Sequence, residues 1–398
     1  MKLNFFCIIL LGFLLIGCWS SNQKQQTGSL PIIDLSKNHP TKEIILQDIA
    51  DIEYIPLETT NDILLGQFSN LNYVSDNYII ISDILQGIFI FNRKGKIISH
   101  INCKGNGPQE YIQIGLTLFD ENNKELFITD SSTRRFLVYS INGEFKRAWK
   151  FADDLLVPLA YNFDEETILI YNNDGFMPNN YNKSEKPYSF MSKKDGSIQS
   201  NIDIRLNVRY STKITQEIDL GGGQKGFTSL SIMIPFNNLY FGNDFVIADM
   251  SSDTIYRLSQ NKELTPILVR TPSVHSSSTP TVWANILTTD KFIVLYTTVL
   301  DLVARAQNRD IPSNILMYEL DRGKVYKVTF ANDDGFITKN FPLNPTVVDI
   351  NKNMFANMLQ PSRLKEAYEA KQLRGLLEKL VSKIDVEDNP IIAIYKFK

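Results

Sequence analysis

Few residues in this chain are of the types that usually perform catalysis. The sequence of 398 residues contains three histidines, His39, His100 and His275, and three cysteines. It has no His-Glu-x-x-His or Cys-x-x-Cys pattern and no Gly-x-Ser-x-Gly turn, so it predicts neither a zinc site nor a serine nucleophile. No metal and no cofactor is expected, and binding is favoured over catalysis.

The best candidate for a ligand site is the segment 104–111, Lys-Gly-Asn-Gly-Pro-Gln-Glu-Tyr. Its glycines and proline predict a loop between two groups of strands. Lys104, Gln109, Glu110 and Tyr111 supply side chains that can converge on a ligand from such a loop. The sequence therefore predicts a polar binding surface here.

Charged residues recur after similar apolar runs. Arg134 and Arg135 follow Asp130 and could reach the same surface, although an exposed pair of cations is the simpler interpretation. Asp83, Asp130 and Asp249 end equivalent runs and could line a channel mouth. Aspartate also accepts hydrogen bonds from turn amides, and that structural role is favoured.

The N-terminus predicts export. Its apolar run from Leu3 to Ile16 is shorter than the roughly 20 residues of a membrane-spanning helix. Leu-Ile-Gly-Cys at 15–18 resembles the bacterial lipobox, so we expect a signal peptide at 1–17 and a diacylglycerol anchor on Cys18. The alternative is a plain signal peptide with an incidental cysteine. Trp19, rather than Asp, follows the lipidated residue and favours the outer membrane.

The elements that carry these residues are predicted to be strands. A polar stretch, expected to be a flexible tether, fills 18–42. Short runs rich in Ile, Val, Phe and Tyr then alternate with Asp, Asn and Gly, which is typical of an all-β protein. Gly95, Gly143 and Gly196 follow successive strand pairs at close to the roughly 40 to 50 residues of a propeller blade. Later repeats contain insertions at 207–229, 271–280 and 301–312.

The two ends of the repeat region are predicted to meet. Strand-like segments at 44–57 and 391–397 have no partner nearby in the sequence. A propeller pairs such strands in one shared blade, here together with 346–350, and thereby removes exposed sheet edges. The sequence thus predicts a six-bladed ring over 43–398.

Four motifs carry a family resemblance: Glu53–Thr59, Phe91–Lys96, Lys104–Tyr111 and Asp388–Ile392. In order and spacing they resemble the six-bladed β-propeller lipoproteins of Bacteroides and relatives, which in turn are similar to NHL-repeat propellers. The resemblance covers nearly the whole mature chain. It implies the fold and an envelope location, and it adds little about activity.

One segment has helical periodicity. Apolar residues between Pro361 and Ile384 fall at steps of three to five, with the proline suited to a first helical turn. We expect one helix, inserted between two strands of the closing blade and packed on the propeller. A helix that docks a partner is the alternative.

Composition narrows the function classes. The chain is 43% hydrophobic and 21% charged, with a net charge of -3, so it is neither disordered nor a general nucleic-acid binder. The leading expectation is an envelope-anchored, non-catalytic binding or scaffold module for a glycan, peptide or protein partner. The alternatives are a propeller-type lyase or hydrolase of an envelope polymer and a structural component of an envelope complex.

Overall fold

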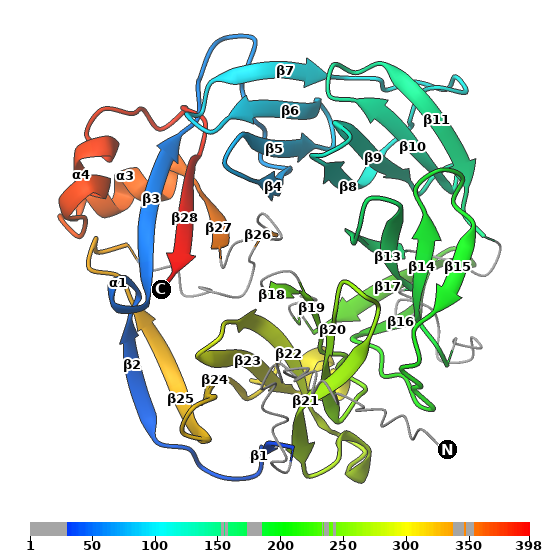
Figure 1. The fold of residues 1–398 in the computed structure, drawn as a ribbon, viewed down its shortest axis with the longest axis vertical. Coiled ribbons are helices and arrows are strands. Elements are labelled where there is room, and N and C mark those ends of the chain that lie inside the picture. The colour runs from blue at the N-terminus through cyan, green and yellow to red at the C-terminus, as the bar shows by residue number, and fades with distance from the viewer. Residues whose placement is uncertain are drawn as a thin grey trace, which may run out of the picture.

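The chain forms a six-bladed β-propeller, which confirms the predicted all-β class (Figure 1). The structure is a computed structural model that describes residues 30–152, 155, 158–172, 185–232, 234, 239–241, 244–336, 346–347 and 354–398. The predicted signal peptide and Cys18 lie outside these residues. Among the described residues, no helix combines the length and the apolar character needed to span a bilayer.

The first three blades are four-stranded antiparallel sheets, each with its first strand innermost. Blade I comprises β4 (Ser69–Val74), β5 (Tyr78–Asp83), β6 (Gly87–Asn92) and β7 (Ile97–Ile101). Blade II comprises β8 (Ile114–Asp120), β9 (Glu125–Asp130), β10 (Arg135–Ser140) and β11 (Phe145–Lys150). Blade III comprises β12 (Pro158–Asn162), β13 (Thr167–Asn172), β14 (Tyr188–Ser192) and β15 (Ile198–Asn201).

The other three blades include strands from the N-terminal segment. Blade IV comprises β18 (Leu239–Phe241), β19 (Asp244–Ile247), β20 (Thr254–Leu258), β21 (Leu264–Thr271) and, at its edge, β1 (Ile32–Asp34). Blade V comprises β22 (Thr281–Thr288), β23 (Phe292–Val299), β24 (Ser313–Glu319), β25 (Lys324–Ala331) and β2 (Thr41–Ile45). Blade VI comprises β26 (Thr346–Val347), β27 (Met354–Leu359), β28 (Ile391–Phe397) and β3 (Ala50–Pro56).

Both faces of the middle strands are buried, and this explains their uninterrupted apolar runs. In β5, Ile79 and Ile81 pack in a cluster with Ile392 of blade VI, whereas Ile80 packs in a cluster with Ile128 of blade II. Successive side chains of a strand point to opposite faces of its sheet. Each blade therefore shares one apolar layer with the blade before it and another with the blade after it.

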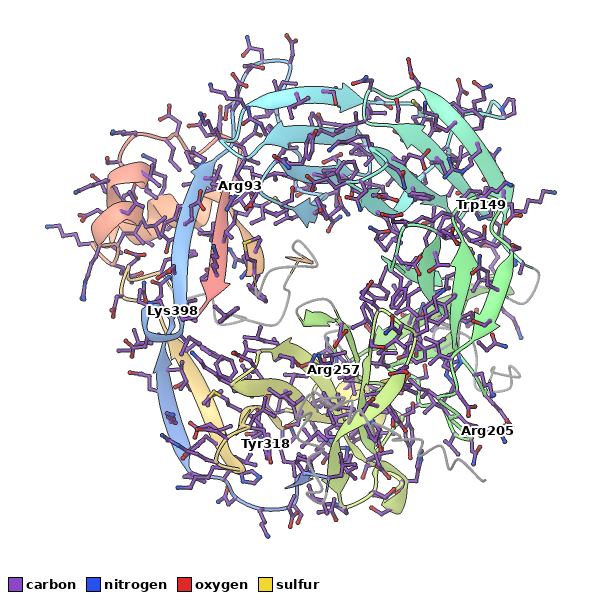
Figure 2. All side chains as sticks on the ribbon, in the orientation of Figure 1. Arg93, Trp149, Arg205, Arg257, Tyr318 and Lys398 are labelled. Carbon is purple, nitrogen blue, oxygen red and sulfur yellow. The ribbon has the colours of Figure 1, made fainter. Side chains whose placement is uncertain are left out.

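The last strand pairs with one of the first, as the sequence predicts. β28 lies antiparallel to β3, from Ile391 opposite Pro56 to Phe397 opposite Ala50. The terminal Lys398 donates its backbone N–H to the Ile49 carbonyl over 3.0 Å. Figure 2 shows Lys398 beside the junction between β2 and β3. The ring is thus closed by strands from both ends of the chain.

The prediction of a flexible tether over 18–42 is wrong for the last part of that segment, which contains strands. β1 pairs in parallel with β21, and β2 pairs in parallel with β25. Their apolar residues explain the difference, because Ile33 is buried against Trp283 and neighbouring side chains, and Ile44 is buried against blade V. Residues 30–57 thus form a belt along the outer edges of blades IV, V and VI (Figure 1).

The single predicted helix is two helices, α3 (Pro361–Glu369) and α4 (Gly375–Val381). Lys371 and Gly375 have φ angles of 55° and 61°, which no α-helix contains, so the segment turns between them. Leu364, Leu373 and Leu377 are buried in the core cluster of blades V and VI. The helices therefore lie between β27 and β28 and cover the propeller, as expected for the simpler interpretation.

A hydrogen-bonded hub joins these helices to the closing blade. The Tyr54 hydroxyl donates to the Asp334 carboxylate over 2.9 Å, and the Asn332 amide donates to the same hydroxyl over 3.3 Å. The backbone carbonyl of Asp334 accepts the N–H of Arg374 over 2.9 Å. Burial raises the pKa of Tyr54 well above its usual value, so the hydroxyl stays a donor.

Connections alternate between two faces of the ring, because neighbouring strands in each blade are antiparallel. One face carries the β4–β5 and β6–β7 connections and the equivalent connections of the other blades. We call it the turn face, and we call the opposite face the loop face. The turn face has tight turns such as 75–77, 93–96, 121–124, 141–144 and 320–323. The loop face has the long segments 57–68, 102–113, 202–232, 272–280, 300–312 and 360–390.

A buried ion pair reinforces the turn face between blades II and III. The Lys193 ammonium contacts the Asp120 carboxylate at 2.5 Å and donates to the Asp164 carbonyl over 2.6 Å. Both side chains of the pair are almost fully buried. A buried charge needs such partners, so this contact fixes the relative position of the two blades.

Two of the predicted insertions have regular structure. The segment at 207–229 overlaps a hairpin of β16 (Lys213–Gly221) and β17 (Gln224–Ser231), whose tip glycines all have positive φ. The segment at 301–312 contains α2 (Leu302–Ala306), which contacts β17 through a bond from the Arg305 side chain to the Ser231 carbonyl. Both insertions stand on the loop face.

The belt yields a test with neighbouring residues. Ile33 is fully buried and Ile32 is 65% exposed. We expect Ile33→Ala to lower the free energy of unfolding by about 2–5 kcal/mol, because a buried side chain is removed. Ile32→Ala should change it by less than about 0.5 kcal/mol. Urea titration of both variants measures this, and equal values would contradict docking of β1 on blade IV.

Candidate functional site

The predicted loop 104–111 folds around its own carboxylate. Glu110 accepts the backbone N–H of Gly107 over 2.8 Å. A Cβ atom on Gly105 would lie 1.9 Å from the same carboxylate, so only glycine fits there without a shift. The N–H of Gly105 also donates to the Tyr111 carbonyl over 3.0 Å. These contacts fix the loop between β7 and β8.

Tyr111 belongs to the core and not to the surface. Its side chain is 1% exposed, and its ring meets that of Tyr139 edge to face. Its hydroxyl accepts the N–H of Cys103 over 3.1 Å. Burial raises the pKa of Tyr111 to about 12. The ring therefore packs blade I against blade II and is not open to a ligand.

Arg135 reaches the loop as expected, but it binds the loop itself. Its guanidinium donates to the carbonyls of Pro108 and Glu110, each over 3.0 Å. The Tyr139 hydroxyl donates to the neighbouring Gln109 carbonyl over 2.7 Å. Two side chains of blade II thereby hold residues 108–110 of the loop that connects blade I to blade II.

Arg134 points to a different connection. Its guanidinium donates to the carbonyls of Ala152 and Leu155 over 3.2 and 3.1 Å. The structure therefore brings Lys104, Gln109, Glu110, Tyr111 and Arg135 together and leaves Arg134 apart. Among these, Lys104, Gln109 and Glu110 are exposed to solvent.

The three recurrent aspartates organise turns on the loop face. Asp83 accepts the N–H of Leu85, Asp130 that of Ser132 and Asp249 that of Ser251, at 2.8 to 3.1 Å. For Asp130, burial alone would raise the pKa, but hydrogen bonds from neighbouring donors outweigh burial and lower it. The structural role favoured from the sequence is the one observed.

A second cluster on the loop face was missed from the sequence. Tyr210, in the connection that leaves β15, stacks on His275 in the connection between β21 and β22. The ring centroids are 5.6 Å apart and the interplanar angle is 19°. The Tyr210 N–H donates to the Ser251 hydroxyl over 3.0 Å, which links the pair to blade IV. His275 is exposed to solvent.

A buried arginine and a partly buried aspartate stabilise the connection that carries His275. Arg270 donates to the carbonyls of Pro272 and Thr281 over 3.0 and 2.5 Å, and so joins the two ends of the connection that carries His275. Asp253 accepts the N–H of Val274 over 2.6 Å. Burial lowers the pKa of Arg270, but its side chain remains paired with these oxygens.

The sequence predicts 207–229 and 271–280 as two separate insertions. They meet because blades III, IV and V are adjacent in the ring. A run of serines around a lone histidine was the only signal in the sequence. Among the described residues, no group of three or more His, Cys, Asp or Glu side chains is placed to hold a metal ion.

Comparison with known proteins identifies related folds. A family model described as "Domain of unknown function (DUF4934)" matches residues 30–396. The crystal structure of a protein described as exported, from Bacteroides fragilis NCTC 9343, is 14% identical, with a TM-score of 0.58. The alignment covers 92% of this chain and 99% of that one. At this identity the similarity concerns the fold alone.

Two other solved structures are more distant. A member of the DUF4221 family from Bacteroides vulgatus is 11% identical with a TM-score of 0.47, over 88% of this chain and 97% of its own. Virginiamycin B lyase from Staphylococcus aureus is 12% identical with a TM-score of 0.38, over 87% and 99%. The chain matches no curated protein sequence.

The position of Tyr111 predicts the outcome of its substitution. Tyr111→Ala should lower the free energy of unfolding by about 3–5 kcal/mol, since an aromatic core side chain is lost. Tyr111→Phe should cost only about 1 kcal/mol, because the ring stays and one hydrogen bond is lost. Lys104→Ala is the surface control. Urea denaturation distinguishes them, and parental stability of Tyr111→Ala would place the ring at the surface instead.

Proposed function

The chain belongs to the family described as "Domain of unknown function (DUF4934)", and on that premise we propose that it is an envelope-anchored binding module. In this proposal the loop face recognises a glycan, peptide or protein partner without chemical conversion. Cys18 carries the lipid anchor, and the outer membrane is the favoured location.

The observation that carries the proposal is the difference between the two faces. Within the described residues, the turn face has tight turns, whereas the loop face carries the β16–β17 hairpin, α2, α3, α4 and the connection with His275. In repeat proteins, insertions gathered on one face often mark the binding face. Side chains from several blades can then contact one partner.

The loop face is also preorganised. Arg135, Tyr139 and Asp130 hold the connections at blades I and II through hydrogen bonds to backbone atoms. Arg270 and Asp253 do the same at blades IV and V. Loops fixed before binding lose little conformational entropy on binding, which favours affinity.

The belt supports an anchored arrangement. The chain enters the described structure at β1, on the outer edge of blade IV. An anchor at Cys18 would therefore connect to the rim of the ring. The similar Bacteroides fragilis protein is described as exported, which agrees with an envelope location.

Site-selective shielding tests the binding face. The pair of variants is Ser278→Cys on the loop face and Arg322→Cys on the turn face, each made in a Cys103→Ser background and coupled to a polyethylene glycol maleimide. Retention of envelope glycans and proteins from the source cells is then measured on immobilised protein. We expect the loop-face conjugate to lose retention and the turn-face conjugate to keep it.

Other outcomes of this experiment would overturn the proposal. Loss of retention in the turn-face conjugate alone would place the binding surface on the opposite side. Equal retention in both conjugates would exclude the loop face as the main surface. Mass spectrometry of the released ligand completes the test, because shortened or modified ligand would show catalysis.

Anchoring is tested separately. Cys18→Ser removes the thiol that carries the acyl chains, each buried methylene of which contributes about 0.8 kcal/mol to membrane binding. We expect the variant to move from the detergent phase to the aqueous phase in phase partitioning. Cys103→Ser is the matched control and should stay with detergent. A detergent-phase Cys18→Ser protein would refute lipidation at this residue.

A further inference from the structure

The Tyr210 hydroxyl has two possible hydrogen-bond partners beside it, the Val274 carbonyl and the His275 ring. The Tyr210 hydroxyl donates its single hydrogen to the Val274 carbonyl over 3.1 Å and lies 3.3 Å from Nδ1 of His275. A tyrosine hydroxyl has one hydrogen to donate. With that hydrogen on the Val274 carbonyl, the tautomer that satisfies Tyr210 carries its hydrogen on Nδ1 and leaves Nε2 as an acceptor. Nε2 has no hydrogen-bond partner among the described residues.

Two serine hydroxyls in the same connection as this imidazole can donate hydrogen bonds to a ligand. The Ser273 oxygen accepts the N–H of His275 over 3.2 Å, and the Ser277 oxygen accepts the N–H of Thr279 over 3.2 Å. With their oxygens engaged by backbone amides, both hydroxyls retain a hydrogen to donate. Both serines are exposed to solvent. The connection thus presents hydroxyl donors beside an imidazole acceptor.

The surface is rigid for a loop. Val274, between Ser273 and His275, is fully buried in a cluster with Val282 and Met250. Arg270 bonds to both ends of the connection, as described above. A preorganised set of donors and acceptors selects ligands by the pattern of their polar groups.

We propose that this surface, Tyr210, Ser273, His275 and Ser277, is a site for neutral saccharides. The inference rests on the proposed function and names the ligand class of its loop face. Two neighbouring hydroxyls of a sugar each donate and accept, so one can donate to Nε2 of His275 while the other accepts from a serine. The exposed imidazole also offers a flat ring for the apolar face of the sugar.

The same geometry disfavours other ligands. The guanidinium of Arg270, which joins the two ends of this connection, is buried and bound to carbonyl oxygens, so it is not available to pair with an anion. The lone pair of Nε2 would repel an anionic oxygen. An extended peptide is usually bound by an open strand edge, and this connection provides a short 3-10 turn at Val274–Ser276 instead.

Three substitutions separate the contributions. His275→Phe keeps a flat ring and removes the acceptor, Tyr210→Phe removes the hydroxyl that directs Nδ1, and Ser277→Ala removes one donor. Asp321→Asn, in the exposed turn 320–323 on the turn face, is the matched control. The probes are biotinylated hexasaccharides of glucose, mannose and xylose, with hexagalacturonate as the acidic counterpart, bound to the full chain and measured by biolayer interferometry.

At least one neutral hexasaccharide should bind the parent chain and bind His275→Phe about tenfold more weakly, since one hydrogen bond is lost. Tyr210→Phe and Ser277→Ala should weaken binding in the same direction, while Asp321→Asn keeps parental affinity. Thermal melting confirms that all four variants fold. Preference for hexagalacturonate, or equal binding by His275→Phe and the parent, would overturn the saccharide site.

Failure of the saccharide site and failure of the proposed function are distinguishable. If no hexasaccharide binds but the loop-face conjugate still loses a retained protein, the saccharide site is refuted and the binding face stands. If a neutral hexasaccharide binds and none of the three cluster variants changes its affinity, the site lies elsewhere on the ring.

Discussion

The structure depends on one constraint, which is that every blade has two apolar faces and only its neighbours can cover them. Ile79 and Ile80, adjacent in β5, belong to different clusters on opposite sides of blade I. An open row of blades would leave an apolar face exposed at each end. The pairing of β3 with β28 removes both ends at once. The loop face and its connections keep their positions only because this circle is complete.

Polar contacts act within that frame and define its faces. On the turn face, the buried Lys193–Asp120 pair fixes two neighbouring blades. On the loop face, side chains bind backbone carbonyls of the next connection, as Arg135 and Tyr139 do for residues 108–110. Such contacts convert exposed loops into fixed surfaces. The loop face can therefore combine long insertions with defined positions for its donors and acceptors.

The fold was largely predictable, because strand periodicity and hairpin glycines are local signals. Gly143, with a φ of 85°, forms its turn where Asn-Gly predicts one. The break between α3 and α4 was missed because Leu373 and Leu377 keep a helical spacing across it. The strand β1 was missed because three residues on the edge of a distant blade leave no periodicity to detect.

The candidate site was less predictable, since it depends on which side chains turn inward. Polar residue types at 104–111 indicated a surface, yet Tyr111 is buried and Arg135 binds the loop backbone. His275 and Tyr210 are far apart in the sequence, and only the adjacency of blades III, IV and V brings them together. A single sequence has no local pattern for that contact.

The belt has a consequence for the order in which the protein can fold. A chain made from its N-terminus produces β1, β2 and β3 first, but their partners β21, β25 and β28 are made much later. Pairing over such sequence distances is slow, because loop closure comes before the contacts that stabilise it. Until then the three strands present unpaired edges that favour aggregation. Of the three, β3 waits longest, so the ring can close only after residues 391–397 have been made.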